Sequence, residues 1–385
     1  VFCIDGSGDD SMFDDMNKVI QSGVFFDLNY LFEKDSEFNK SDYLESAMMA
    51  GSFDGKQYFF PTGIETPIFL SSKQVLEQTK FDLSKCKNTQ DFIKQLKSYT
   101  ENRPPDDNRF ILNWGADDPD IYLELLNVID YKNQSVTLGT SEVKNVFETL
   151  KLVCDKTNED FPKEDLLDEN TRVNCFEKNN VLFFGNEMGY GLLDMSALMN
   201  DTVEPVLYPT YNNEGKIQAK IATGIAINAN SPNKQNAYDF LKLALDWKRE
   251  PYDKDSRMEH IDRIDGYENI PPEQYLYTKS VFFPVIKARF EYDVDYMKRI
   301  FDTGWFYSEY EDKLYDNLEN IKIKPLPDEI YKQFKDIYYN IDVCTILNPA
   351  IEKVAEIMKP YLEGKKSYEE CIENAQDKLE IYISE

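Results

Sequence analysis

Histidine occurs once in the 385 residues, as His260. It lies in the stretch MEHIDRID, where charged residues flank it, and this setting is typical of a solvated surface side chain. Enzymes that pair a Ser or Cys nucleophile with a base need an imidazole held by its partners, and many zinc hydrolases need histidine ligands. The sequence therefore argues against both classes of enzyme.

The glycine-containing stretches do not complete a phosphate-binding motif. Asp5–Asp10 (DGSGDD) lacks the third glycine of a dinucleotide-binding loop and is acidic. Gly55-Lys56 is followed by Gln57, where a Walker loop has Ser or Thr. No window fits the calcium-binding loop with its glycine and closing glutamate. We expect neither a cofactor nor a metal ion.

The cysteines are widely spaced and form no C-x-x-C pair, which argues against a zinc ribbon and a thioredoxin-like motif. They are Cys3, Cys86, Cys154, Cys175, Cys344 and Cys371. Disulfides in an exported protein and buried free thiols both stay open. A carboxylate pair for glycoside hydrolysis also stays open, because 71 acidic residues give many pairs by chance.

The clearest structural element is Ile221–Asp246. Its apolar start, broken by Gly224, predicts a buried strand that bends or is closely approached. Ser231 is then expected to cap a helix and Pro232 to occupy its first position. The core-facing stripe of this helix is expected to be Ala237, Phe240, Leu241, Ala244 and Trp247.

Further elements follow on both sides of this one. Asp54-Gly55 predicts a hairpin turn before a strand at Lys56–Phe60, and Asn102–Asn108 (NRPPDDN) has the composition of a linker. Asn348 or Pro349 opens a helix that Gly364 stops, and Ser367 with Glu370 forms a capping box for the last helix. Strands and helices thus alternate, as in an α/β protein.

In this order the elements resemble the extracellular solute-binding proteins of ABC importers, the group that includes maltose-binding protein. The resemblance is carried by SGVFFDLN, DGKQYFFPTGIE, the capped strand–helix segment and YLEGKKSYEECIENAQDKLE. It implies an α/β, two-lobe periplasmic-binding-protein-like fold (type II), with the lobes joined by a multi-crossover hinge. Relatives carry a secretion signal and a first strand–helix–strand section, so an N-terminal part with the first strands is expected to be missing here.

The resemblance also implies the division into lobes. We expect the first lobe to comprise residues 1–110 and 223–285 and the second lobe 111–222 and 286–385, with crossovers near 110, 222 and 286. Gly224 would then lie at the hinge. The segment Arg249–Tyr277 is charged and irregular, and no chemistry can be assigned to it.

The ligand-facing residues are implied by the same resemblance. Glu65, the last residue of a P-x-x-x-E motif, is the first choice, against the alternative of a solvated or internally paired glutamate. Its expected companions come from both lobes: Asp5, Ser7, Trp114, Asp117, Tyr190 and Trp305. Aromatic faces and carboxylates suit sugars, which offer C–H faces and hydroxyl groups. Trp114 precedes its acidic neighbours here, unlike in the family, and Trp305 could equally belong to the core.

Size and charge agree with such a protein. A chain of 385 residues predicts two domains, and a net charge of -28 argues against binding to nucleic acid or to anionic lipid. We expect a non-catalytic, monomeric protein that is extracellular, held at the cell surface by a lipid anchor, or periplasmic. It is expected to pass a small solute, a sugar or oligosaccharide, to ABC permease subunits. A carbohydrate-active hydrolase and a surface adhesion or scaffold protein are the alternatives.

Overall fold

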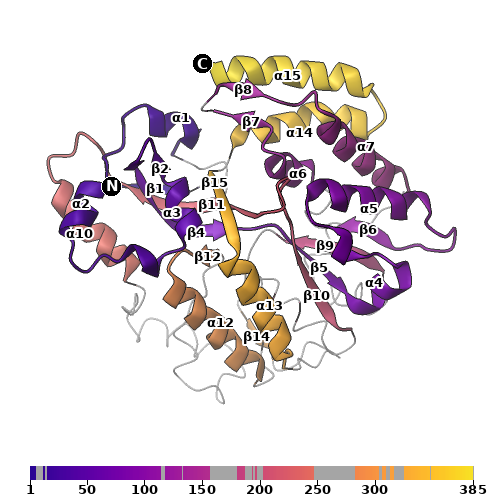
Figure 1. Ribbon diagram of the computed structural model, residues 1–385, viewed down its shortest axis with the longest axis horizontal. Helices are drawn as coiled ribbons and strands as arrows, with labels where there is room; N and C mark the ends of the chain where they lie inside the picture. The colour runs from indigo at the N-terminus through magenta and orange to yellow at the C-terminus, as the bar shows by residue number, and fades with distance from the viewer. Residues whose placement is uncertain are drawn as a thin grey trace.

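The computed structural model of this protein describes residues 1–5, 12–13, 15–113, 118–131, 133–156, 180–186, 193, 196, 203–246, 282–302, 306–308, 313–315, 325–346 and 348–384. These residues form two separate β-sheets with helices around them (Figure 1). The expected α/β, two-lobe architecture is therefore confirmed, with one sheet in each lobe.

The first sheet is five-stranded and mixed. Its path is β1 (Phe2–Asp5), β11 (Ile217–Ala226), β4 (Phe59–Glu65) and β12 (Phe283–Pro284), with antiparallel neighbours throughout. β15 (Ile341–Ile346) lies off this path and pairs in parallel with the first half of β11. β11 is the central strand, because it bonds to β1 and β15 along one edge and to β4 along the other.

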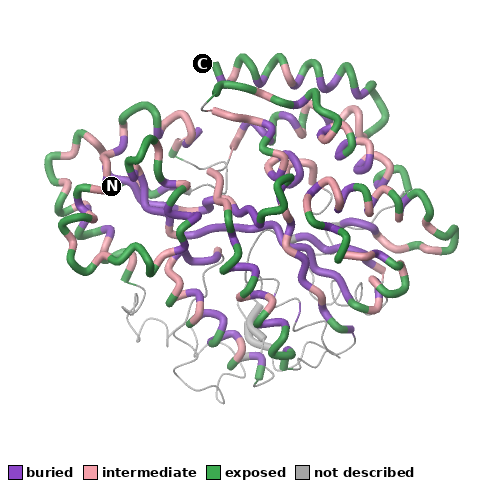
Figure 2. The backbone as a smooth tube through the Cα atoms, viewed as in Figure 1, coloured by how far each residue is buried: buried purple, intermediate pink, exposed green. Residues whose placement is uncertain are grey.

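The second sheet is four-stranded, in the order β10 (Pro205–Pro209), β5 (Ile68–Ser72), β9 (Val181–Asn186) and β6 (Phe110–Asn113). β5 runs antiparallel to both of its neighbours, whereas β6 and β9 are parallel. Every side chain of β5 is buried, as expected of a central strand with helices on its faces. Figure 2 shows this burial continuing through the strands of both sheets.

Each sheet has its own helices. Around the first sheet lie α1 (Met16–Gln21), α2 (Asn29–Lys34), α3 (Glu45–Ala50), α10 (Lys234–Leu245), α12 (Lys287–Asp302) and α13 (Asp328–Tyr339). Around the second lie α4 (Lys73–Thr79), α5 (Thr89–Glu101), α6 (Pro119–Leu125), α7 (Ser141–Lys156), α14 (Pro349–Leu362) and α15 (Tyr368–Ser384).

The short elements complete the description. Two-stranded pairs are formed by β2 (Ser52–Phe53) with β3 (Lys56–Gln57), β7 (Ile129–Asp130) with β8 (Ser135–Val136), and β13 (Phe306–Ser308) with β14 (Lys313–Tyr315). Lys40–Asp42 and Leu83–Lys85 are 3₁₀ turns. The expected Asp54-Gly55 hairpin is confirmed: both residues have positive φ, at 49° and 78°, as a type I′ turn requires.

The chain changes sheet at places that differ from those expected. The first change lies between β4 and β5, at Glu65–Ile68, and not near 110. The second lies between β10 and β11, a few residues before the expected position at 222. The last follows β15 at Ile346 and not 286, because β12 still pairs with β4. The segment 59–72 thus contains two strands that belong to different sheets.

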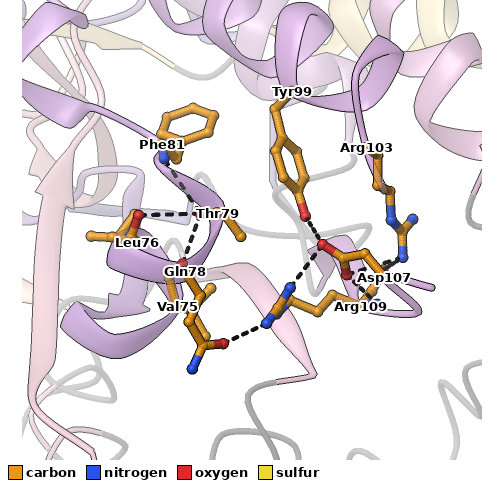
Figure 3. Close-up of polar contacts among 9 residues, drawn as sticks. All are labelled: Val75, Leu76, Gln78, Thr79, Phe81, Tyr99, Arg103, Asp107 and Arg109. Atoms are coloured by element: carbon orange, nitrogen blue, oxygen red, sulfur yellow. Dashed lines mark hydrogen bonds and ion pairs between the residues drawn. The ribbon is translucent and has the colours of Figure 1, made fainter. Parts of the chain in front are cut away.

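The expected linker at Asn102–Asn108 is instead an ordered loop within the second lobe. Asp107 accepts hydrogen bonds from the Tyr99 hydroxyl (2.8 Å) and from the Arg109 side chain (2.7 Å), and Figure 3 shows these side chains converging on it. Arg103 lies 3.7 Å from the same carboxylate. The proline and aspartate composition therefore marks a turn between α5 and β6, with its charges paired.

Two details of the Ile221–Asp246 segment also differ from expectation. α10 begins at Lys234, and the Ser231 hydroxyl accepts a bond from the Asn233 amide instead of capping the helix. The buried side chains of α10 are Tyr238 and Leu241, while Phe240 is exposed, so the expected stripe is rotated. The Tyr238 hydroxyl donates a hydrogen bond to the Asp35 carboxylate (2.9 Å), and this bond helps to hold the Tyr238 side of the helix against the lobe. Trp247 lies outside the described residues.

Gly224 is confirmed as a site of close approach. A Cβ there would lie 3.0 Å from the Phe59 ring and 3.1 Å from the Phe60 carbonyl oxygen. The residue pairs with Ile4 on one side and Pro61 on the other, so it lies inside the sheet. The change of sheet occurs before β11 begins, so Gly224 lies beyond it, and the expected role of Gly224 as a hinge stays a prediction.

Candidate functional site

Most residues expected to face a ligand fall outside the described part of the chain. Ser7, Trp114, Asp117, Tyr190 and Trp305 are among these, and they stay predictions. Asp5 is the last residue of β1, as expected, and its backbone is paired with Thr223. Glu65 is the one whose side chain the structure describes in full.

Glu65 ends β4 at the point where the chain leaves the first sheet for the second. Its carboxylate is buried and lies 3.6 Å from the ammonium group of Lys220, with 6% and 14% of the two side chains exposed. Lys220 comes from β11, the strand by which the chain returns to the first sheet. The ion pair therefore joins two of the chain's crossings between lobes, and Glu65 is internally paired.

The strands that precede the predicted contacts end close to one another. β6 and β9 are parallel neighbours and end at Asn113 and Asn186. The segments that carry Trp114, Asp117 and Tyr190 follow directly. In open α/β sheets, ligands bind beyond the carboxyl ends of parallel strands. α6 begins beside this edge, with Asp118 capping its first turn through a 3.0 Å bond from the Asp120 amide.

Asp120, in that first turn, has an unusual carboxyl group. Burial, and then the nearby carboxylates of Asp118, Glu124 and Glu352, raise its pKa to about 8, although Lys220 partly opposes them. Its Oδ1 atom is buried and has no hydrogen-bond partner among the described residues. At neutral pH this carboxyl is therefore largely protonated, and its Oδ1 is an acceptor left unused.

The side chain of Gln218 hydrogen-bonds the start of β11 to residues of the second lobe. Its side-chain amide donates to the Glu124 carbonyl (3.0 Å), and its side-chain oxygen accepts from Asn127 (3.4 Å) and Asn212 (3.3 Å). Its backbone carbonyl accepts a bond from the Thr66 hydroxyl (3.0 Å). The side chain is almost fully buried, so these bonds are made out of water and fix the start of β11 against the second lobe.

A groove of about 460 Å³ lies between the lobes. Its first wall comes from α1, α3 and β2, its second from α6 and the β7 region, and β15 and the start of α14 join them. The polar lining residues are Asn17, Gln21, Ser52, Glu124, Asn127, Asp130, Tyr131, Thr345 and Asn348. The volume falls in the range of small-molecule sites. Glu65 is not part of this lining.

Sequence reasoning missed Lys220, Gln218 and Asp120. Lys220 and Gln218 did leave a signal, because they are polar residues inside the apolar strand IQAKIATGIA. A lysine in a buried strand needs a partner of opposite charge. Asp120 left a weaker signal: Asp118 and Glu124 are near it in the sequence, but the burial that contributes most to its raised pKa cannot be read from these neighbours.

The described residues show no metal centre: no group of three or more His, Cys, Asp or Glu side chains is placed to hold an ion there. Within the same residues, no helix has the length and apolar character needed to cross a bilayer. The described cysteines, Cys3, Cys86, Cys154, Cys344 and Cys371, are free thiols.

Solved structures of similar fold are binding proteins. MalE, the sugar-binding protein of Xanthomonas citri, superposes with a TM-score of 0.59 at 7% identity, over 96% of this chain and 82% of that one. The GacH receptor of Streptomyces glaucescens, solved unliganded and with acarbose, gives 0.52 at 18% identity over 95% and 80%. Lmo0181 of Listeria monocytogenes, an ABC substrate-binding protein in complex with cycloalternan, gives 0.52 at 11% identity over 96% and 82%.

Sequence comparison agrees with the fold. No curated protein sequence matches the chain significantly. The profile of the bacterial extracellular solute-binding proteins, however, matches residues 6–248, which is well over half of the chain and includes β4, β11 and the first two crossings between the lobes. The chain therefore belongs to the bacterial extracellular solute-binding protein family.

Proposed function

We propose that this protein is the substrate-binding component of an ABC importer, and that it captures a sugar or oligosaccharide between its lobes and delivers it to a membrane permease. The observation that carries the proposal is the interlobe groove, because both lobes contribute polar side chains to it. A ligand held by both lobes stabilises one relative arrangement of them, which is how hinge-closing binding proteins respond to ligand.

The chemistry of the groove favours a neutral, hydroxyl-rich solute. Its described lining includes the carboxylates of Glu124 and Asp130 and no lysine or arginine, so an anionic solute would lack a counter-charge there. Amides and carboxylates bond directionally to hydroxyl groups, and Phe53 and Tyr131 offer aromatic surface. MalE, GacH and Lmo0181, which share the fold, are described with sugars or sugar-like ligands.

The proposal includes four finer points. The protein binds without turnover, as befits its family. It acts outside the cytoplasm, either periplasmic or held at the cell surface by a lipid anchor. It works as a monomer, with permease subunits as partners, and its charge of -28 disfavours nucleic acid. Asp5, Ser7, Trp114, Asp117, Tyr190 and Trp305 stay the proposed ligand contacts.

A panel of neutral sugars, uronic acids, amino acids, polyamines and oligopeptides tests this proposal by thermal shift and calorimetry. A bound neutral sugar at one hundred times its dissociation constant should stabilise the protein by about 2.7 kcal/mol. The sugar should be recovered unchanged after hours, since a product would indicate a hydrolase. If no neutral sugar stabilises the protein, the sugar proposal fails, and a shift with another class would name the solute instead.

Matched variants locate the site. Asn17→Ala and Asp130→Ala remove lining groups from opposite walls of the groove and should each weaken sugar binding about tenfold or more. Asp106→Ala removes an exposed carboxylate outside the groove and should leave binding unchanged. Equal binding by all three variants would place the solute elsewhere.

A further inference from the structure

Asp15 connects the two lobes at the start of α1. Its Oδ1 atom accepts the backbone amides of Asn17 (2.9 Å) and Lys18 (3.4 Å) and so caps the helix. Its Oδ2 atom accepts the hydroxyl groups of Tyr131 (2.7 Å) and Tyr382 (2.9 Å). With 6% of its surface exposed, Asp15 makes all four bonds in a nearly dry site.

The partners belong to different lobes. The buried side chains of α1, Met16 and Ile20, pack in the hydrophobic cluster that contains the core of the first sheet and one face of the second, and not in the cluster of α6, α7, α14 and α15. Tyr382, near the end of α15, packs instead against the cluster that joins α6, α7, α14 and α15. Tyr131 directly follows β7, whose Ile129 packs against that same cluster. In Figure 1, α1 lies beside the C-terminal end of α15, as these bonds require.

Two lysines reinforce the contact from opposite lobes. Lys18 of α1 lies over the Tyr382 ring at 4.1 Å from its centroid, and Lys353 of α14 lies at 3.9 Å from the same centroid. Lys18 also donates to the Tyr382 carbonyl oxygen. The Tyr382 ring is thus held by cation–π contacts from both lobes, which adds to the hydrogen bonds at its hydroxyl.

The hydroxyl groups are suited to donate. Burial, and then the Asp15 carboxylate, raise the pKa of Tyr131, so its hydroxyl keeps its proton at any physiological pH. The same hydroxyl lies 2.9 Å from Oδ1 of Asn348, the residue that caps α14. The network therefore links the N-termini of two helices in different lobes, and Asn17, Tyr131 and Asn348 also line the interlobe groove.

We propose that Asp15, Tyr131 and Tyr382 form an interlobe clasp that holds the lobes in the arrangement seen here. A rotation of one lobe against the other about an axis away from these residues separates Asp15 from both tyrosines. The clasp thus opposes lobe movement directly, and solute-driven movement must break it. It depends on the two-lobe fold and not on the identity of the solute, so failure of the sugar proposal would leave it intact.

The distance between the lobes tests the clasp without any ligand. Cys3 in β1 and Cys154 in α7 are exposed thiols on different lobes, and both can carry spin labels. Cys175 and Cys344 are replaced by serine in all samples, while Cys86 and Cys371 are buried. Pulsed electron spin resonance then gives the distribution of interlobe distances.

The informative variant is Tyr131→Phe with Tyr382→Phe. Each lost hydroxyl removes a bond to a buried carboxylate, so each should shift the equilibrium between lobe arrangements about tenfold. We expect a second distance population, or a broadened one, in the double variant and a smaller change in either single variant. Asp15→Asn, which keeps the helix cap but loses the charge, should give an intermediate result.

Two matched controls separate the clasp from a general loss of tyrosine–aspartate bonds. Tyr99→Phe removes the bond to Asp107 inside the second lobe, and Tyr238→Phe removes the bond to Asp35 inside the first. Both should leave the distance distribution unchanged. The clasp is refuted if the folded double variant keeps the parent distribution, or if the control variants change that distribution as much.

Discussion

The carboxylate of Glu65 lies 3.6 Å from the ammonium group of Lys220, so one ion pair joins the strand that leaves the first sheet to the strand that returns to it. Both groups are largely withdrawn from water. Removing one partner of such a pair leaves a buried charge without its counter-charge, and this costs far more than loss of an exposed pair. The pair is therefore a structural element of the crossing.

The first prediction follows from this pair. Glu65→Gln should lower the free energy of unfolding by about 3 kcal/mol, because Lys220 then stays buried without its partner. If Glu65 served only as a ligand contact, its replacement would leave the melting point of the free protein unchanged. Urea denaturation distinguishes the two. Glu204→Gln, which breaks the exposed Lys73–Glu204 pair, is the control and should have almost no effect.

The second prediction concerns Asp120 and pH. Its pKa is about 8 in the folded protein against 3.8 when exposed, so the folded state holds a proton that the unfolded state releases between these values. The stability that this group contributes is complete below pH 3.8 and is lost as the pH rises through 8. Asp120→Asn, which stays neutral, should therefore gain stability relative to the parent as the pH rises from 5 to 8.5.

Thermal melts of the two proteins across that pH range check the prediction. Asp106→Asn removes an exposed carboxylate and controls for the change in net charge. A difference between Asp120→Asn and the parent that stays constant with pH would show that the group titrates at its ordinary value.

The third prediction concerns Gly224. A methyl group there would press on the Phe59 ring and the Phe60 carbonyl inside a fully paired sheet. Gly224→Ala should therefore destabilise the protein by about 1–3 kcal/mol. Gly139→Ala is the matched control, since a Cβ at Gly139 meets no atom within 4 Å, and its effect should stay within about 0.5 kcal/mol. Equal stability of both variants would contradict the close approach.

The fourth prediction concerns the loop that joins α5 to β6. Asp107→Ala removes the acceptor shared by Tyr99 and Arg109 and should cost about 2–3 kcal/mol of stability. The neighbouring substitution Asp106→Ala should hardly change the free energy of unfolding, because Asp106 is exposed. Chemical denaturation compares the two, and similar midpoints would show that the loop has little part in stability.

Local structure was largely predictable from the sequence, since its signals act over a few residues. The Ser367–Glu370 capping box is present, with the Ser367 and Glu370 amides bonded to each other's side chains at 3.1 and 3.2 Å. Gly364 stops α14 with a φ of 71°. The order of these elements was also enough to indicate the family.

Other features depended on contacts between distant segments. Nothing in the sequence of residues 59–72 assigns its two strands to different sheets, and only the pairing of β4 with β11 and of β5 with β9 divides them in this way. The buried face of α10 was decided by Asp35, about 200 residues away in the chain, which bonds Tyr238. Neither the division between sheets nor the buried face of α10 can be read from residues that are close together in the sequence.

What the sequence by itself determined is the set of helices and strands, their caps and turns, and the class of protein that their order indicates, because backbone preference and side-chain periodicity are properties of neighbouring residues. The tertiary structure alone decided where the chain passes between lobes, that Glu65 pairs with Lys220, and that Asp15 meets Tyr131 and Tyr382. Those relationships bring together residues more than 100 positions apart, and only the packing of complete sheets and helices places their charged and polar groups within bonding distance.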